Sequence, residues 1–284
     1  MHKVEIAIIG ARGFVGSSIY NELVNQGFSA IPITRKNINL SNDSFCSFSK
    51  LVSNKSILVF SAAIAPTRSS DDFFENMTIL RNFIVAASKI KPLYILNISS
   101  DAIYPDSPYP LTEDVAPSPT SIHGLMHYVR ESLLNIAFPG IVGHIRPTLI
   151  YGATDPHNGY GPNSFMRNAL KNSDLTLFGE GEELRDHIYI GDVSKLAVEM
   201  LKQLVPQAVN AASGHVVSFF EIAQNIIGMT GKGRILFKTR EYSVPHNGYR
   251  PINIDKAIRM FPGLNPLQIE DGLRIMHGEM MKRE

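Results

Sequence analysis

Hydrophobic and polar positions follow two alternating patterns along the first half of the chain. Short apolar runs alternate with three stretches that have helical spacing. Such apolar runs are typical of strands buried on both faces of a parallel sheet. The predicted strands are Val4–Ile9, Ala30–Thr34, Ile57–Ser61, Leu93–Ile98 and Ile141–Ile145, and the predicted helices are Phe14–Gln26, Asp72–Lys89 and Ser121–Phe138. This repeated order with short connections predicts an α/β fold with a doubly wound parallel sheet.

The pattern changes after Tyr151, where a loop rich in Gly, Asn and Pro (GATDPHNGYGPNS) precedes less regular segments. We interpret the later segments as a smaller α/β lobe over the carboxyl ends of the strands, where open α/β sheets bind ligands. The predicted sheet domain covers residues 1–150 and about 187–212, and the smaller C-terminal lobe covers about 151–186 and 213–284.

Composition excludes several classes of partner. Lys and Arg total 27 against 26 Asp and Glu, so the chain lacks the basic excess typical of proteins that bind nucleic acid or an anionic membrane. The longest nearly apolar run, Ile57–Pro66, is about half of the ~20 residues that a membrane helix requires. A single cysteine, Cys46, cannot form an intramolecular disulfide. We therefore expect a cytoplasmic protein without nucleic-acid or membrane partners.

Three glycines, Gly10, Gly13 and Gly16, follow the first predicted strand and open the first predicted helix. Glycines at this place allow a tight turn, close approach of the backbone to a pyrophosphate, and close contact between helix and sheet. The helix N-terminus adds unpaired N–H groups and the positive end of the helix dipole. An ordinary strand–helix turn is the alternative, but the position in a βαβ series favours dinucleotide binding.

The end of the second predicted strand indicates which dinucleotide binds. Sites for NAD place an acidic residue about 20 residues beyond the loop, on the adenosine ribose. Here the sequence reads Ile33-Thr34-Arg35-Lys36, and the nearest carboxylate, Asp43, lies well past the strand. Arg35 can clamp a 2′-phosphate and Arg12 can reach the same group, although a solvated strand end is the alternative. We predict NADP(H) as the preferred cofactor and NAD(H) as the second possibility.

The loop spacing G-x-x-G-x-x-G resembles the extended short-chain dehydrogenase/reductase superfamily, which contains nucleotide-sugar epimerases, dehydratases and ketoreductases. Further similar stretches are LNISSDAIYP at 96–105, IRPTLIYG at 145–152 and LFGEGEELRDHIYIGDV at 177–193, and the resemblance extends from Val4 to about Met276. GARGFVGS…ITRKNINL is similar to the NADPH-using ketoreductase branch, which includes GDP-fucose synthase. The resemblance implies a Rossmann-like cofactor domain and a nucleotide-sugar substrate.

The resemblance, together with the glycine loop, gives a set of expected cofactor-binding residues. They are Gly10, Arg12, Gly13, Phe14, Val15, Gly16, Thr34, Arg35, Ser61, Ala62, Ala63, His127 and Pro147. It also implies a catalytic hydroxyl at Ser100, although a Ser-Ser-Asp cluster also commonly turns a chain. Asp101 completes this part of the expected catalytic set. Related dehydratases carry an Asp-Glu pair here, whereas this chain has Asp101 and Ala102, which counts against dehydration.

The chain departs from its relatives where a Tyr-x-x-x-Lys motif is expected, because both motif positions are histidine, His123 and His127. Residues four apart share a helix face, so the two imidazoles could take over the catalytic work. In this interpretation Glu131 could orient His127, and a protonated histidine would suit carbonyl reduction, with His123 giving the proton. A second interpretation is a sensor or scaffold that binds without turnover. A third is a zinc pair, but no further ligand is evident and we expect no metal.

The resemblance also assigns substrate contacts in the second half of the chain. Arg185 is expected to contact the nucleotide diphosphate, with an ion pair to Asp186 as the alternative, and Arg250 is a second phosphate-binding candidate. Asn163 is expected to contact the sugar or phosphates, unless its loop is simply a turn. A homodimer through the helices near 72–90 and 121–138 is implied as well.

These observations predict an NADP-dependent oxidoreductase or epimerase acting on a nucleotide-activated sugar, with 4-keto reduction as the preferred reaction. The alternatives are a catalytically silent binding protein and an NAD-dependent nucleotide-sugar epimerase.

Overall fold

The computed structural model describes residues 4–42 and 48–283, so Asp43 and Cys46 lie outside the described residues. The chain forms two compact units that are interleaved in sequence. The first comprises Met1–Pro105, Glu113–Pro147 and Val193–Asn210, and the second comprises Asp106–Thr112, Thr148–Asp192 and Ala211–Glu284.

These boundaries differ from the predicted ones at 106–112, which belong to the second unit. The backbone of Leu111 explains the difference, because its N–H donates to Pro251 and its carbonyl accepts from Asn253. The return of the chain to the first unit begins at Val193, later than the predicted position of about 187.

The first unit is built on a six-stranded sheet of order β2-β1-β3-β4-β5-β9. Its strands are β1 (Ile6–Ile9), β2 (Ala30–Ile33), β3 (Ile57–Phe60), β4 (Tyr94–Ile98), β5 (Val142–Pro147) and β9 (Ala208–Ala211). The pairs from β2 through β5 are parallel, and the five predicted strands match β1 to β5 within about two residues at either end. The α/β fold class is therefore confirmed.

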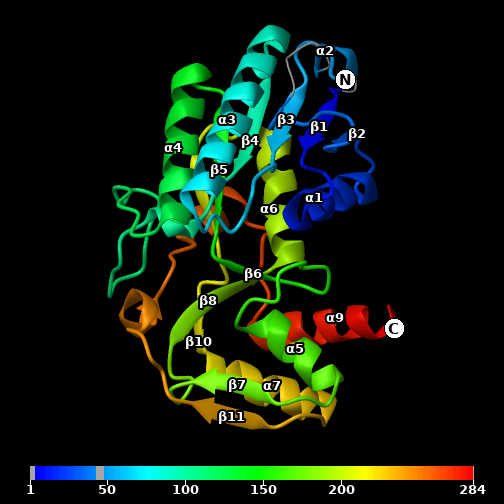
Figure 1. Cartoon of the computed structure of the whole chain (residues 1–284). Coiled ribbons are helices and arrows are strands. Elements are labelled where there is room, and N and C mark those ends of the chain that lie inside the picture. The colour runs from blue at the N-terminus through cyan, green and yellow to red at the C-terminus, as the bar shows by residue number, and fades with distance from the viewer. Residues whose placement is uncertain (1–3, 43–47, 284) are drawn as a thin grey trace. The chain divides into compact units, whose positions relative to one another are not determined.

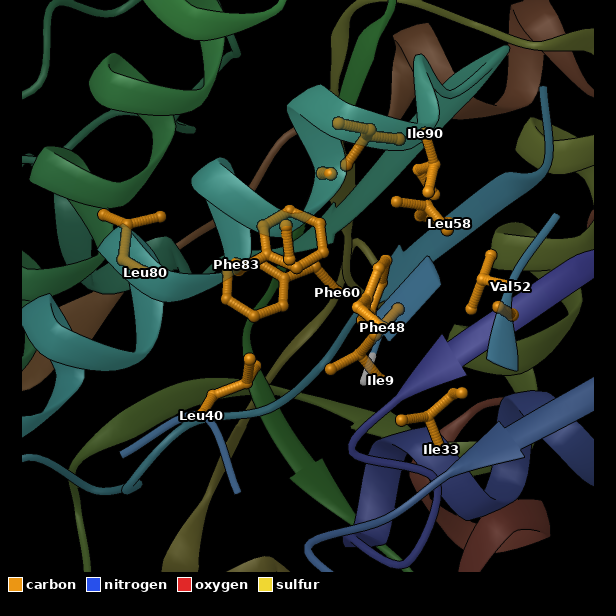
Figure 2. Close-up of a cluster of buried hydrophobic side chains, with 14 of the residues drawn as sticks. Ile9, Ile33, Leu40, Phe48, Val52, Leu58, Phe60, Leu80, Phe83 and Ile90 are labelled. Carbon is orange, nitrogen blue, oxygen red and sulfur yellow. The ribbon is translucent and has the colours of Figure 1, made fainter. Parts of the chain in front are cut away.

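The helices of this unit are α1 (Phe14–Asn25), α2 (Phe48–Leu51), α3 (Ser70–Ile90), α4 (Ile122–Ala137) and the 3₁₀ turn η1 (Asp101–Ile103), and α6 (Ile190–Gln203) enters it from the second unit. Helices α3 and α4 lie side by side (Figure 1). Residues from β1, β3, β4 and α3 form a buried hydrophobic cluster, which Figure 2 shows around Phe48, Phe60 and Phe83. The rings of Phe60 and Phe83 are stacked with their centroids 3.9 Å apart.

The strand order places a topological switch point beside β1. The chain passes from β1 to β2 on one side, and then to β3 on the other side of β1. Connections that leave in opposite directions open a crevice at the carboxyl ends of the central strands, where α/β sheets bind ligands. The glycine turn that follows β1 lies at this crevice.

The second unit contains smaller sheets. Strand β8 (Leu184–Tyr189) pairs with β10 (Val216–Ser218), β12 (Tyr249–Arg250) and β6 (Leu149–Tyr151), and β7 (Leu175–Phe178) pairs with β11 (Ile235–Lys238). Its helical segments are α5 (Pro162–Leu170), α7 (Phe219–Thr230), η2 (Pro245–Gly248), α8 (Asp255–Met260) and α9 (Ile269–Met281). Within residues 4–42 and 48–283, no helix has the length and apolar character needed to cross a membrane.

Candidate functional site

The glycine turn after β1 is closed by the backbone and requires small residues. The Gly13 N–H donates to the Gly10 carbonyl at 2.9 Å. Gly10 has φ +95°, and a Cβ there would lie 2.7 Å from the backbone nitrogen of Ala62. At Gly16 a Cβ would lie 2.3 Å from the Gly10 carbonyl oxygen. A side chain at Gly10 would therefore force the turn away from the segment after β3, and one at Gly16 would force α1 away from the turn.

A cavity of about 530 Å³ lies beside this turn, where β1, β2 and β3 end. Eight of the thirteen residues predicted to bind a cofactor line it: Gly10, Arg12, Gly13, Thr34, Arg35, Ser61, Ala62 and Ala63. The other five, Phe14, Val15, Gly16, His127 and Pro147, are outside its lining. Gly16 acts on the turn by close packing, and Pro147 is buried at the end of β5.

The lining also includes residues 38–41, which the sequence did not single out. Two amides hold this part of the wall. The Asn37 side-chain oxygen accepts from the backbone N–H of Thr34 at 2.9 Å, and Asn82 on α3 donates to the carbonyl of Leu40 at 2.7 Å. In the sequence, this part of the cavity wall is marked by the alternation of the apolar residues Ile38 and Leu40, both of which are buried. An alternation of this length is too short to identify a strand or a cavity wall.

Charge distinguishes the cavity lining. Arg12, Arg35 and Lys36 are among the lining residues, and the described lining contains no Asp or Glu. An anionic ligand is favoured by this balance, because a carboxylate would repel a phosphate and a guanidinium binds one through parallel hydrogen bonds. The close-packed glycine turn and the cationic wall together fit a dinucleotide with its phosphates at the turn.

A second group of predicted residues gathers where β4 meets α4. Ser100 precedes η1, and its hydroxyl accepts from the backbone N–H of Ala102 at 3.1 Å. Gly124 on α4 packs against this turn, since a Cβ there would lie 2.0 Å from the Ala102 carbonyl oxygen. The glycine brings the adjoining His123 close to Asp101, whose negative charge acts on the His123 imidazole.

Backbone contact fixes the proton position on neutral His123. Its Nδ1 accepts from the Thr67 N–H at 3.3 Å, so the ring proton of the neutral form is on Nε2. Burial lowers the pKa of His123 below its ordinary value of 6.5, although Asp101 acts in the opposite direction. The structure therefore favours a neutral His123 near neutral pH.

His127 is the more deeply buried imidazole, and it meets His123 edge to face with the ring centroids 4.7 Å apart. Burial lowers the pKa of His127 well below 6.5, and the neighbouring His123 and Arg130 lower it further. Its Nδ1 has no hydrogen-bond partner among the described residues.

The expectation that Glu131 orients His127 is wrong. Both Glu131 oxygens accept from the Arg146 guanidinium, at 3.0 and 2.8 Å. The zinc interpretation also lacks support, because the described part of the chain contains no cluster of three His, Cys, Asp or Glu side chains that could hold a metal ion.

The predicted substrate residues lie in the second unit, and each has partners there. The Arg185 guanidinium forms an ion pair with Glu183 at 2.8 Å, while the Asp186 carboxylate accepts from the backbone of Ser213 and Gly214. Arg250 is almost fully buried, and its Nη1 lies 3.4 Å from the Asp106 carboxylate.

Asn163 is engaged at both ends of its amide. Its oxygen accepts from the Gly152 N–H at 3.0 Å, and its nitrogen donates to Asp155 at 2.6 Å.

A doubly wound sheet, a glycine turn at its switch point and a cationic cavity together define a dinucleotide-binding α/β protein. Its family is specific: the chain belongs to the NAD dependent epimerase/dehydratase family, whose sequence pattern matches residues 6–212. The chain is 24% identical over 281 residues to GDP-L-fucose synthase of Escherichia coli strain K12, a match that covers 84% of this chain and 85% of the relative.

Solved structures share the fold at low sequence identity. UDP-glucuronic acid 4-epimerase from Bacillus cereus, in complex with UDP-glucuronic acid and NAD, superposes with a TM-score of 0.84 and 19% identity over 99% of this chain and 100% of that one. A GDP-L-fucose synthetase from Naegleria fowleri bound to NADP has a TM-score of 0.84 and 14% identity, over 100% of this chain and 94% of that one. Structures with this fold therefore include NAD-bound and NADP-bound proteins.

Proposed function

We propose that the chain is an NADP(H)-dependent oxidoreductase that acts on a nucleotide-activated sugar, with reduction of a 4-keto group as the preferred reaction. The observation that carries the cofactor assignment is the cavity lined by Arg12, Arg35 and Lys36, with no carboxylate in its described lining. A 2′-phosphate gains from cations at this place, whereas NAD would leave them without a ligand. The similarity to GDP-L-fucose synthase supports the class of reaction.

The glycine turn and the Ser61–Ala63 segment would hold the dinucleotide, and Arg12 and Arg35 would bind its 2′-phosphate. When bound, NADPH supplies a hydride to the carbonyl carbon. The chain itself must polarise the carbonyl and deliver one proton to its oxygen, so that a ketone, a hydride and a proton give an alcohol.

His123 is the proposed donor to that oxygen. Its Nδ1 is occupied by the Thr67 N–H, so its Nε2 proton is the one directed to a ligand. In the neutral ring this N–H donates a hydrogen bond that stabilises negative charge on the oxygen. Complete proton transfer uses the imidazolium form, in which Nδ1 is also protonated and no longer accepts from Thr67. The fraction of this form rises as pH falls toward a pKa below 6.5. Ser100 is proposed as a second hydrogen-bond donor, with Asp101 favouring the protonated form of His123.

For the substrate, we propose that Arg185 and Arg250 contact the diphosphate. Glu183 and Asp106 fix the positions of these guanidinium groups, and a planar guanidinium is well suited to recognise a phosphate. Asn163 already bonds Gly152 and Asp155, so we assign it to the shape of the 152–163 loop.

The test combines binding and turnover. Thermal shifts with NADPH and with NADH, each alone and with a panel of nucleotide sugars and their 4-keto derivatives, identify the ligands. NADPH oxidation is then followed with the selected sugar. Stoichiometric consumption of NADPH supports a reductase, whereas isomerised sugar without net cofactor change supports an epimerase. Stabilisation by NADH alone would overturn the NADP assignment.

One observation favours a second candidate, a binding protein without turnover. His127 is neutral and fully enclosed, so this site lacks a cationic side chain at that position. Binding of NADPH and a nucleotide sugar with no product in the wild type, and none in the double variant His123→Tyr with His127→Lys, would support a sensor or scaffold.

A further inference from the structure

Arg130 on α4 places a guanidinium inside the first unit. The residue is 3% exposed, and its described partners are the side-chain oxygen of Asn97 and two backbone carbonyls rather than a carboxylate. Burial lowers the pKa of Arg130 to about 9, so the group still carries its charge at neutral pH. Burying a charge that has no counterion costs free energy. The position of Arg130 relative to the cavity and the imidazoles indicates its role.

The Arg130 side chain binds the last residue of β3 and the segment that follows it. Its Nη2 donates to the Phe60 carbonyl at 2.6 Å, and its Nη1 donates to the Ala62 carbonyl at 2.9 Å. Carbonyls two residues apart in an extended chain face the same edge. The planar guanidinium therefore supplies two donors where a neighbouring strand would otherwise supply backbone N–H groups. Its carbon also lies 3.7 Å from the centroid of the Phe60 ring, a ring that Figure 2 shows in the core.

The segment that Arg130 holds is one wall of the cavity. Ser61, Ala62 and Ala63 all line it. The same segment packs on the glycine turn so closely that a Cβ at Gly10 would meet Ala62. A shift of this segment by a few tenths of an ångström would therefore change both the cavity wall and the glycine turn.

A buried hydrogen-bond network fixes Arg130 from the opposite side. Its Nε donates to the Asn97 side-chain oxygen at 2.6 Å. The Asn97 nitrogen then donates to Nδ1 of His144 at 3.1 Å, and Nε2 of His144 donates to Asn135 at 3.0 Å. This assignment is consistent because burial lowers the pKa of His144 to about 4 and keeps its ring neutral. His144 is therefore a core residue with both ring nitrogens hydrogen-bonded.

Arg130 also lies three residues after His127 on α4, which places both side chains on neighbouring positions of one helix face. Its positive charge acts on the His127 ring. One side chain thus binds the cavity wall and acts electrostatically on His127.

We propose that Arg130 is a positioning residue of the cofactor site, which holds the Phe60–Ala62 segment against Gly10 and provides the fixed positive charge behind His127. The inference rests on the proposed dinucleotide site. It assigns the permanent cation of this region to position 130 rather than to position 127, where the imidazole stays neutral.

The test compares Arg130→Met, Arg130→Lys and the control Asn135→Ala, which removes only the far end of the network. Dissociation constants for NADPH are measured by fluorescence, and His127 is titrated by NMR between pH 5 and 8 in the ligand-free proteins. Circular dichroism and thermal melts identify the variants that fold.

Arg130→Met is expected to weaken NADPH about tenfold and to move the His127 titration to higher pH than in the wild type. Arg130→Lys should also weaken NADPH, because one ammonium cannot reach both carbonyls in the planar geometry, but it should keep His127 closer to the wild-type titration. Asn135→Ala should leave both readouts close to those of the wild type.

NADPH affinity within twofold of wild type in both folded Arg130 variants would overturn the positioning role, and identical His127 titrations in Arg130→Met and wild type would overturn the electrostatic role. If Arg130→Met does not fold, Arg130→Lys decides the positioning role. A wild-type protein that binds neither NADPH nor NADH would refute the proposed function. The His127 titration would then still test the electrostatic role of Arg130, because it is measured in the ligand-free proteins.

Discussion

Glu131 and Arg146 form a bidentate ion pair inside the first unit, with both carboxylate oxygens within 3.0 Å of the guanidinium. Both side chains are less than a tenth exposed. Arg146 also donates to the Tyr104 hydroxyl and to the carbonyl of Glu113. The pair therefore ties α4 and β5 to the segments around Tyr104 and Glu113, and its role is to hold the frame of the site.

Replacing Glu131 by Gln is expected to reduce the free energy of unfolding by about 3–5 kcal/mol, because Arg146 would remain buried without its counterion. Urea denaturation at pH 7 measures the change. A suitable control is Asp271→Asn, which breaks the exposed pair with Arg274 and should leave stability nearly unchanged. A loss below about 1 kcal/mol for Glu131→Gln would show that the buried pair is not a major support.

The same pair predicts how stability depends on pH. Burial alone would raise the pKa of Glu131, but hydrogen bonds from Arg146 outweigh it and lower the pKa below 4.5. A carboxylate with a lowered folded-state pKa stabilises the fold above its unfolded value, and this contribution is lost as pH falls through the folded value. The stability difference between wild type and Glu131→Gln should therefore shrink below pH 4.5. A difference that is constant from pH 3 to 7 would contradict this linkage.

Close contact between α4 and η1 predicts a specific cost at Gly124. Substitution by Ala would place a Cβ 2.0 Å from the Ala102 carbonyl oxygen, and overpacking of this kind costs about 1–3 kcal/mol. The matched control is Gly228→Ala on α7, where nothing lies within 4 Å and the better helix former should stabilise by about 0.5–1 kcal/mol. Thermal melts of the two variants should shift in opposite directions, and parallel shifts would refute the packing argument.

Local patterns were sufficient for the framework of the first unit. The apolar run at Ile57–Ser61 predicted β3, and the glycine spacing predicted the turn at its switch point, because both depend on residues adjacent in sequence. The charge of Arg35 could be assigned to the cavity because Arg35 follows the second predicted strand directly. Local spacing predicts these features because strand burial and turn geometry are properties of short segments.

Partners across long sequence distances were not predictable from spacing. Glu131 has an imidazole four residues away in sequence, yet it pairs with Arg146, which reaches it from β5. In the sequence, Arg130 is a polar position of a predicted helix. In the structure its side chain donates to the carbonyls of Phe60 and Ala62, which lie about 70 residues earlier in the chain. Both depend on which strand lies beneath α4, and that is a property of the folded sheet.

Arg35→Ala tests the proposed choice of cofactor. A charged hydrogen bond to the 2′-phosphate contributes about 1.5–3 kcal/mol, so the variant should bind NADPH roughly ten- to hundredfold more weakly while its NADH affinity changes little. Isothermal titration calorimetry with both dinucleotides measures the ratio. Lys55→Ala, at an exposed position outside the cavity lining, is the control and should change neither. Equal losses for NADPH and NADH would remove Arg35 from 2′-phosphate recognition.

Exposed apolar side chains on α3 and α4 test the predicted homodimer. Phe74 is 66% exposed and Ile136 is 76% exposed, and Leu125, Tyr128 and Leu133 on α4 are also exposed. We expect the wild type to elute as a dimer and Ile136→Glu to shift it toward monomer, because a charge would be buried in the interface. Tyr109→Glu, at an equally exposed residue in the second unit, is the control. A monomeric wild type in light scattering would refute the dimer.

The pH dependence of turnover tests the assignment of the proton donor. Because burial lowers the pKa of His123 below 6.5, its imidazolium form is the minor form at neutral pH, and its fraction decreases as pH rises. The rate of NADPH oxidation at saturating substrate should therefore fall with increasing pH, with a midpoint below 6.5. His123→Gln retains an N–H donor but cannot titrate, so it should be slower and should lose this dependence. His277→Gln, on α9 in the second unit, is a matched control that should keep the wild-type profile. An active wild type with a flat profile from pH 5.5 to 8.5 would exclude His123 as the titrating donor. A rate that depends on the imidazolium fraction of His123 must fall as pH rises.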